Sequence, residues 1–156
     1  MNFPIRKIIL LYSVIAIIIC ASLAYSHCQI PCGIYDDHAR IEMITEHIKT
    51  IEKSCRQIQL LSEKLPVDHN QITRWVNNKE HHADELAQII TWYFMAQRIK
   101  PAPPQRPAEY KSYVNCLTLL HEMLIHTMKA KQSTELANIE KLKTLLTKFH
   151  EAYEKK

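Results

Sequence analysis

The residues best suited to chemistry lie together in the stretch 27–35, which reads His-Cys-Gln-Ile-Pro-Cys-Gly-Ile-Tyr. It supplies one imidazole, His27, and two thiols, Cys28 and Cys32. Imidazoles and thiolates are the side chains that bind borderline and soft transition metals. The pattern therefore indicates a metal chelate, provided that processing makes His27 the first residue of the chain.

Residues 1–26 have the features of a secretory signal peptide, which is why such processing is expected. Residues 6–7 are basic, residues 8–23 are almost wholly apolar, and Ala24-Tyr25-Ser26 places small residues at the two positions that a signal peptidase reads. Cleavage after this site would give His27 a free amine. The alternative is an uncleaved membrane anchor, because the apolar run is near the lower limit for a membrane span.

With a free amine, the first two residues become a chelating unit. The amine of His27 and the amide nitrogen of Cys28 bind one metal in a five-membered ring, and the Cys28 thiolate closes a second such ring. Cys32, returned by a turn at Ile30-Pro31, adds another thiolate, while the His27 imidazole reaches an axial position. A planar set of two nitrogens and two sulfurs favours nickel or copper over zinc, which takes tetrahedral sites. Amide and thiolate donors push electron density onto the metal, so a redox site with accessible Ni(III) is expected.

The motif His-Cys-x-x-Pro-Cys-Gly-x-Tyr at a processed N-terminus resembles the nickel hook of nickel-containing superoxide dismutase, and residues 27–35 match it at every fixed position. The resemblance extends at lower specificity through residues 39–42 (Ala-Arg-Ile-Glu), 79–83 (Lys-Glu-His-His-Ala) and 92–94 (Trp-Tyr-Phe), and into the proline-rich joint after Lys100. It implies dismutation of superoxide anion to dioxygen and hydrogen peroxide, with one nickel ion per chain that alternates between Ni(III) and Ni(II).

The resemblance also implies roles for residues outside the ligand set. Glu42 matches the family glutamate that orients the axial histidine, and a weak axial ligand has to be held in place. Tyr35 and Tyr93 match the tyrosines that crowd the open face of the metal, where their hydroxyls could hold an ordered water and admit only a small anion. The family arginine that supports the axial histidine is missing, and His82 stands in its region as a substitute. A homohexamer of four-helix bundles, with hooks near subunit contacts, is implied as well.

Length and charge limit the remaining possibilities. The chain has 156 residues and a formal charge of +4. Removal of residues 1–26 leaves 130, enough for one modest core, and takes away the charges of Arg6 and Lys7. So weak a positive surplus argues against nucleic-acid binding, which needs basic residues concentrated on one face. The mature protein is expected to be exported, to a periplasm, an organelle lumen or the medium, and to have no membrane attachment once cleaved.

The cysteines allow a different reading of the same stretch. In an exported protein, Cys28 and Cys32 would by default form a disulfide, and the chain would then be a helical-bundle binding protein without enzymatic activity. A third possibility is a nickel or copper carrier that uses the same chelate without turnover. Cys55 and Cys116 fall on predicted apolar helix faces, so buried thiols are expected there.

Four amphipathic helices are expected in residues 36–156. Asp36 or Asp37 caps the first, which ends at Pro66, and Asp68 caps the second. Residues 79–82 interrupt the apolar face of the second helix and are expected to form a solvated patch, with His82 turned inward. The apolar positions recur at steps of three and four: Ile41, Ile44, Ile48, Ile51, Cys55, Ile58 and Leu61 in the first helix, then Ile72, Trp75, Val76, Leu86, Ile89, Ile90, Tyr93 and Phe94 in the second.

The joint at residues 100–107 contains four prolines and separates the second helix from the third. The third is expected at residues 108–128, and the fourth from a cap at Ser133. Short connections favour an antiparallel up-and-down bundle, so the predicted fold is all-α: a four-helix bundle behind an N-terminal metal-binding hook. The expected inward residues are Tyr110, Val114, Leu117, Leu120, Leu124 and Met128, then Leu136, Ile139, Leu142, Leu145, Leu146, Phe149 and Tyr153.

Overall fold

The computed structural model describes residues 7–15 and 30–155, and this part of the chain contains helices and no strand. The all-α class is therefore confirmed for the described residues. The chain divides into two compact units, Met1–Gly33 and Ile34–Lys156. In the first unit, residues 7–15 are helical and residues 30–33 form a bend. Within the described ranges, no helix is both long enough and apolar enough to cross a bilayer.

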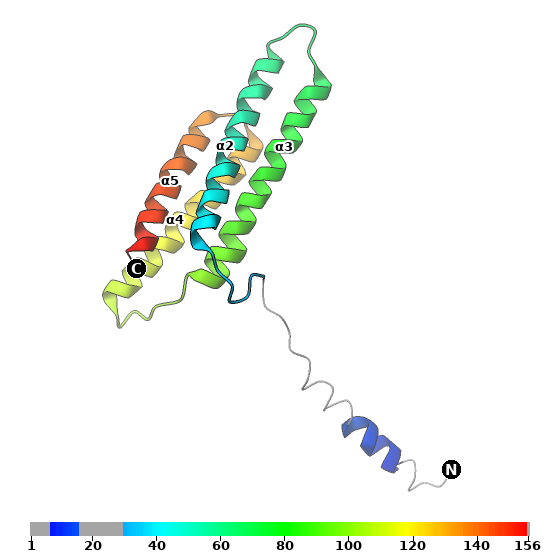
Figure 1. Cartoon of the computed structure of the whole chain (residues 1–156), viewed down its shortest axis with the longest axis vertical. Helices are drawn as coiled ribbons and strands as arrows, with labels where there is room; N and C mark the ends of the chain where they lie inside the picture. Colours follow the sequence, from blue (N-terminus) through cyan, green and yellow to red (C-terminus); the bar gives the residue numbers. More distant parts are fainter. Residues whose placement is uncertain (1–6, 16–29, 156) are drawn as a thin grey trace. The chain divides into compact units, whose positions relative to one another are not determined.

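The second unit consists of helices that run alongside one another (Figure 1). α2 packs along α3 and α5, and α4 packs along α5 and α3. Consecutive α-helices run in opposite directions, and α3 passes directly into the π-helical segment η1 (Figure 1). The bounds of the elements are α2 Asp37–Ser62, α3 His69–Gln88, η1 Ile89–Arg98, α4 Pro107–Gln132 and α5 Leu136–Glu154.

The starts of α2 and α3 are capped as the sequence predicts. The Asp36 carboxylate accepts a hydrogen bond from the Ala39 N–H at 2.9 Å, and the Asp68 carboxylate accepts one from the Gln71 N–H at 3.0 Å. Each cap satisfies one of the backbone donors that a helix N-terminus leaves without a partner. Asp36 is therefore the residue that caps α2, and the Asp37 side chain makes other contacts.

The stripe predicted for α2 is the centre of the core. Its residues Ile44, Ile51 and Cys55 are fully buried. Helix η1 adds Phe94, whose ring lies edge-to-face against Phe149 of α5 with centroids 5.0 Å apart. Such aromatic pairs contribute about 0.5–1.5 kcal/mol beyond their buried area. Further core residues are Ile41, Ile48, Ala83, Leu86, Ile89, Ile90, Ile139, Leu142, Leu145 and Leu146.

The inward face predicted for α4 is wrong in part. Tyr110, Val114 and Met128 are exposed, with 40%, 39% and 51% of their surface accessible. This helix carries apolar residues on two adjacent faces, each with steps of three and four, so periodicity alone does not choose between them. Packing against α3 and α5 selects the less bulky face. Its buried residues are Cys116, Leu120, Met123, Thr127 and Ala130.

The predicted cap of the last helix is also wrong. Ser133 ends α4 instead of starting α5: its hydroxyl donates to the Lys129 carbonyl at 3.2 Å and accepts from the Glu135 N–H at 3.3 Å. Helix α5 begins at Leu136, and Glu135 occupies the cap position without a side-chain hydrogen bond there. A serine hydroxyl can hydrogen-bond to the carbonyls at the end of one helix as readily as to the N–H groups at the start of another. The presence of a serine at position 133 therefore does not predict which of the two helices it caps.

Lys79 departs most from the sequence-based expectation. Residues 79–82 were predicted to be a solvated patch, and His81 is exposed and His82 half-buried, but the Lys79 side chain is only 4% exposed. Its ammonium donates to the carbonyl of Ala130 at 2.8 Å, to the carbonyl of Lys131, and to Glu80 at 3.0 Å. It thereby satisfies carbonyls at the C-terminal end of α4, where the helix dipole favours a cation.

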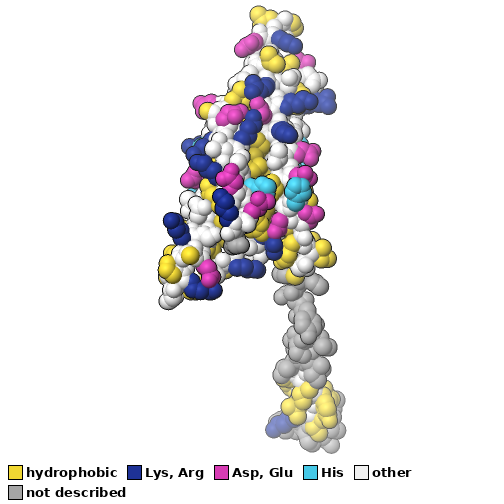
Figure 2. Space-filling model, turned by 60° about the vertical axis from the view of Figure 1, so that its left-hand side comes forward, with side chains coloured by type: hydrophobic (Ala, Val, Ile, Leu, Met, Phe, Trp, Pro, Cys, Tyr) yellow, Lys and Arg dark blue, Asp and Glu magenta, His cyan; other side chains and the backbone are white. Residues whose placement is uncertain are grey.

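The surface of the second unit carries both signs of charge. On the face shown in Figure 2, Lys and Arg side chains are interspersed with Asp and Glu. Several form ion pairs, such as Lys143 with Glu52 at 2.7 Å and Lys131 with Asp84 at 2.6 Å. Exposed pairs of this kind contribute about 0–1 kcal/mol each, so the stability of the fold depends mainly on its core.

We expect Lys79→Met to lower the free energy of unfolding by about 1–3 kcal/mol, because the buried carbonyls of α4 lose their donor. Urea unfolding of the mature protein, followed by circular dichroism, measures the change. Lys148→Met is the matched control, since Lys148 is exposed on α5. Equal midpoints for the two variants would contradict the capping role of Lys79.

Candidate functional site

The structure describes only part of the predicted metal-binding hook. His27 and Cys28, like the predicted cleavage site, lie outside the described residues. Cys32 is exposed and lies in the bend at residues 30–33, where a turn is predicted. Gly33 has a φ of +79°, a left-handed conformation that residues with a Cβ resist. The glycine thus marks a special backbone position beside Cys32.

Tyr35 and Tyr93 are brought together in the second unit. Their rings lie edge-to-face, with centroids 5.9 Å apart and an interplanar angle of 81°. Tyr93 is 3% exposed and Tyr35 is 37% exposed, so one ring is in the core and the other at the surface. The Arg98 guanidinium lies over the Tyr35 ring, 4.4 Å from its centroid. The two tyrosines predicted to act together are therefore in direct contact.

A carboxylate that the sequence analysis treats only as a possible cap lies behind this pair. Oδ1 of Asp37 accepts from the Tyr93 hydroxyl at 2.6 Å and from Arg98 Nε at 2.8 Å. Oδ2 accepts from Arg98 Nη2 at 2.6 Å and from the Tyr153 hydroxyl at 2.8 Å. One carboxylate thus joins the start of α2 to η1 and α5, through a bidentate pair with Arg98 of the kind that is both strong and geometrically specific.

The pKa values in this cluster follow from these contacts. Desolvation raises the pKa of the Asp37 carboxyl, but hydrogen bonds from Arg98, Tyr93 and Tyr153, with the Arg98 charge, outweigh it and hold the pKa at about 2. Burial and the hydrogen bond to Asp37 raise the pKa of Tyr153 to about 12, and the same causes raise the pKa of Tyr93. Asp37 is therefore an anion and both tyrosines are neutral across the physiological range.

Helix η1 accounts for the meeting of Tyr93 and Arg98. In an α-helix, residues five apart point about 140° away from each other. In a π-helix each N–H bonds to the carbonyl five residues earlier, so residues five apart come nearly into line. The Ile99 N–H accordingly donates to the Phe94 carbonyl at 2.8 Å at the end of η1. The wider turn lets Tyr93 and Arg98 reach the same carboxylate.

The remaining predicted residues pair with other histidines. Glu42 lies one helical turn beyond His38, with Oε1 3.2 Å from His38 Nε2, and both side chains are largely exposed. His82 contacts His47 of α2, with their Nδ1 atoms 2.8 Å apart. Among the described residues, no hydrogen bond joins Glu42 to His82. Glu42 is accessible, whereas His82 is part of a half-buried pair.

Four residues of these clusters were missed or given another role by the sequence analysis. The sequence predicts only a capping role for Asp37 and a core position for Tyr153, and it predicts no role for Arg98 or His47. Asp37 and Arg98 are 61 residues apart, so no local spacing links them. The only available signal was the position of Asp37 directly after the hook, at the start of a helix already capped by its neighbour.

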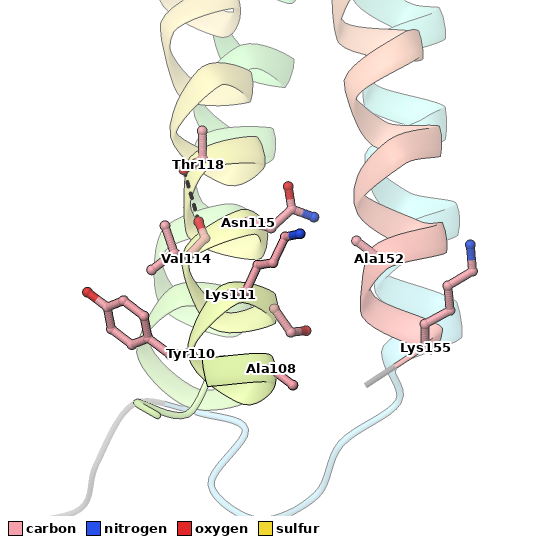
Figure 3. A pocket seen from close by; sticks show the side chains of 9 residues that line it. Ala108, Tyr110, Lys111, Val114, Asn115, Thr118, Ala152 and Lys155 are labelled. Atoms are coloured by element: carbon pink, nitrogen blue, oxygen red, sulfur yellow. Dashed lines mark hydrogen bonds between the residues drawn. The ribbon is translucent and has the colours of Figure 1, made fainter. Parts of the chain in front are cut away.

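An open hollow on the described surface lies elsewhere. It has a volume of about 840 Å³ and lies between the start of α4 and the end of α5 (Figure 3). Tyr110, Val114 and Thr118 line it from α4, and Ala152 and Lys155 from α5. None of the predicted site residues lines it. Within the described residues, no group of three or more His, Cys, Asp or Glu side chains is arranged to hold a metal ion.

Comparison with known protein families identifies a match over most of the chain. The model of the family described as nickel-containing superoxide dismutase matches residues 22–156. The matched range includes the stretch 27–35 and the whole of the second unit. No curated protein matches the chain, and no solved structure matches it.

The His47–His82 pair makes stability depend on pH. Burial, with the charge of His82 adding to it, lowers the pKa of His47 below its ordinary 6.5. The folded state thus binds a proton less readily than the unfolded state, so the stability that neutral His47 contributes is present above pH 6.5 and lost as the pH falls through the lowered pKa. We therefore expect the urea concentration at the unfolding midpoint of the metal-free mature protein to decrease as the pH is lowered from about 7.5 to about 5.

The variant His47→Gln should weaken that dependence, because glutamine does not titrate. His121→Gln is the control, since His121 is exposed on α4. If the urea midpoint of the His47→Gln variant decreases as steeply as that of the wild type when the pH is lowered, His47 is not the cause of the pH dependence.

Proposed function

Because the chain belongs to the family of nickel-containing superoxide dismutases, we propose that it dismutates superoxide at a nickel centre formed by its own N-terminal residues 27–35. The enzyme class and the nickel cofactor follow from the family. The hook assignment depends on one observation: the sequence His-Cys-x-x-Pro-Cys-Gly-x-Tyr, directly after a signal-like leader and inside the matched range.

The donors of the hook fit nickel. His27 would supply its amine and imidazole, Cys28 its thiolate and amide nitrogen, and Cys32 its thiolate. Two thiolates and two nitrogens are donors that suit nickel, and a nickel ion held by them would supply the one-electron chemistry between Ni(III) and Ni(II) that dismutation of superoxide needs. The exposure of Cys32 and the bend with a left-handed conformation at Gly33 support this role, since the sulfur is accessible and the chain changes direction beside it.

The protein side chains control access and orientation. The Tyr35 ring, half in contact with solvent, would restrict the approach to the metal so that only a small anion enters. Glu42 would orient the imidazole of His27, and the exposure of the Glu42 carboxylate supports this role. His82 would assist in place of the family arginine, and its contact with His47 gives it a fixed ring position from which to do so.

The proposal extends to processing and assembly. Residues 1–26 would be removed by signal peptidase during export, leaving residues 36–156 as an antiparallel up-and-down four-helix bundle behind the hook. The alternating direction of α2, α3, α4 and α5 supports this bundle. A homohexamer would follow the family pattern, and the exposed apolar residues Tyr110, Val114 and Met128 of α4 are surface that such contacts could cover.

Activity should depend on a free amine at His27. A peptide bond to a preceding residue turns the amine into an amide, a much poorer donor that adds bulk at the metal. The experiment compares mature protein starting at His27 with protein carrying one extra Met, each loaded with nickel. We expect about one nickel per chain and activity only in the first, with the same circular dichroism spectrum for both. Equal activity would refute the N-terminal chelate and favour the Cys28–Cys32 disulfide.

Changing Glu42 should affect the axial ligand without removing the metal. We expect Glu42→Gln to keep its nickel and to lose about 10 to 100-fold in rate, the usual scale when a partner of a metal ligand is removed. The Ni(III) electron paramagnetic resonance spectrum reports the axial nitrogen. Glu46→Gln, an exposed change one turn along α2, is the control. A wild-type rate and spectrum for Glu42→Gln would exclude it from the mechanism.

A further inference from the structure

The structure gives the two tyrosines at the hook different roles. Tyr93 is buried and donates its hydroxyl to Asp37 at 2.6 Å. The Tyr35 hydroxyl makes no hydrogen bond with any residue that the structure describes, and its ring is partly exposed. A phenol has a single proton to donate. The Tyr93 proton is therefore committed to a carboxylate, whereas that of Tyr35 is available.

Asp37 has no acceptor position left for another partner. A carboxylate accepts about four hydrogen bonds, and Asp37 receives four: two from Arg98, one from Tyr93 and one from Tyr153. Its charge is balanced by Arg98 at 2.6 Å. The carboxylate is therefore suited to holding its neighbours in place, and not to exchanging a proton with a substrate.

The Tyr35 ring is held by two groups that Asp37 fixes. The Tyr93 ring meets it edge-to-face at 5.9 Å, and the Arg98 guanidinium covers it at 4.4 Å. Contacts of a cation with an aromatic face contribute about 0.5–1 kcal/mol at exposed sites. Since Asp37 is hydrogen-bonded to both Tyr93 and Arg98, it determines where the Tyr35 ring lies without touching it.

We propose that Asp37 is a positioning residue that, through Tyr93 and Arg98, holds Tyr35 as the tyrosine whose hydroxyl meets the anionic substrate. This inference rests on the proposed function, because the substrate is that of the proposed nickel site. It assigns to Tyr93 a supporting role, its hydroxyl serving to fix its own ring. It also gives the ion pair between Asp37 and Arg98 a part in activity.

A double-mutant cycle on the nickel-loaded mature protein tests the proposal, because a residue that acts through Tyr35 loses its effect when Tyr35 is changed. Asp37→Asn should lower the rate on the order of 10-fold at unchanged nickel content, the lower end of losses from removed supporting contacts. Tyr35→Phe should lower the rate too, and the double variant should be no slower than Tyr35→Phe alone. A loss in the double variant equal to the product of the single losses would overturn the proposal, as would a wild-type rate for Asp37→Asn.

Two further variants complete the cycle. Glu52→Gln removes another α2 carboxylate that accepts from two cations, Arg56 at 2.7 Å and Lys143 at 2.7 Å, and it should leave the rate unchanged. Arg98→Lys keeps the charge but loses the bidentate geometry and the planar contact with Tyr35. If Asp37→Asn does not fold, Arg98→Lys takes its place in the cycle with the same expected result, and a wild-type rate for it would overturn the proposal.

A measurement on the nickel-free protein separates this inference from the proposed function. The mature protein has five tyrosines, and ultraviolet titration should show that two of them, Tyr93 and Tyr153, ionise at a higher pH than the others. Asp37→Asn should lower the pKa of both toward the ordinary value of about 10. If no variant or wild-type protein dismutates superoxide, the proposed function fails. If Asp37→Asn leaves the titration of both tyrosines unchanged from the wild type, the positioning role of Asp37 fails, whatever the activity.

Discussion

The pairing of Asp37 with Arg98 is the constraint on which the end of the second unit that carries Tyr35 and Tyr93 depends. It joins the first residue of α2 to the last residue of η1, and the same carboxylate receives the hydroxyl of Tyr153 from α5. Three segments distant in sequence are thereby held at the point where the chain leaves the hook. Bidentate pairing fixes direction as well as distance, so the aromatic rings around the pair have defined positions.

Charged groups connect the helices in two different ways. Asp37 and Arg98 neutralise each other while partly exposed, so each keeps some contact with water. Lys79 is instead buried and is satisfied mainly by backbone carbonyls at the end of α4. A buried cation is tolerated only when its donors are all used, and a helix C-terminus offers several acceptors together. Both arrangements tie the end of one helix to the side of another.

The fold could be predicted largely because the core repeats are local. The α2 stripe and the caps at Asp36 and Asp68 follow from spacing and residue type within a few turns, and the structure confirms them. Prediction failed for α4, where two faces satisfy the same spacing, and at Ser133, whose hydroxyl serves either end of a helix. In both places the partner helices made the choice, and their positions are not encoded within a short window of sequence.

The sequence by itself indicated the family and predicted the donor set of the proposed nickel site, because the residues of the motif lie within six residues of one another and their covalent spacing would define the chelate rings. It also identified Tyr35 and Tyr93 as a pair. Only the tertiary structure decided how that pair is held, because Asp37 and Arg98 meet across 61 residues and through a π-helical turn. A chelate built from neighbouring residues can be read from the chain, whereas a hydrogen-bond network between helices depends on how those helices pack.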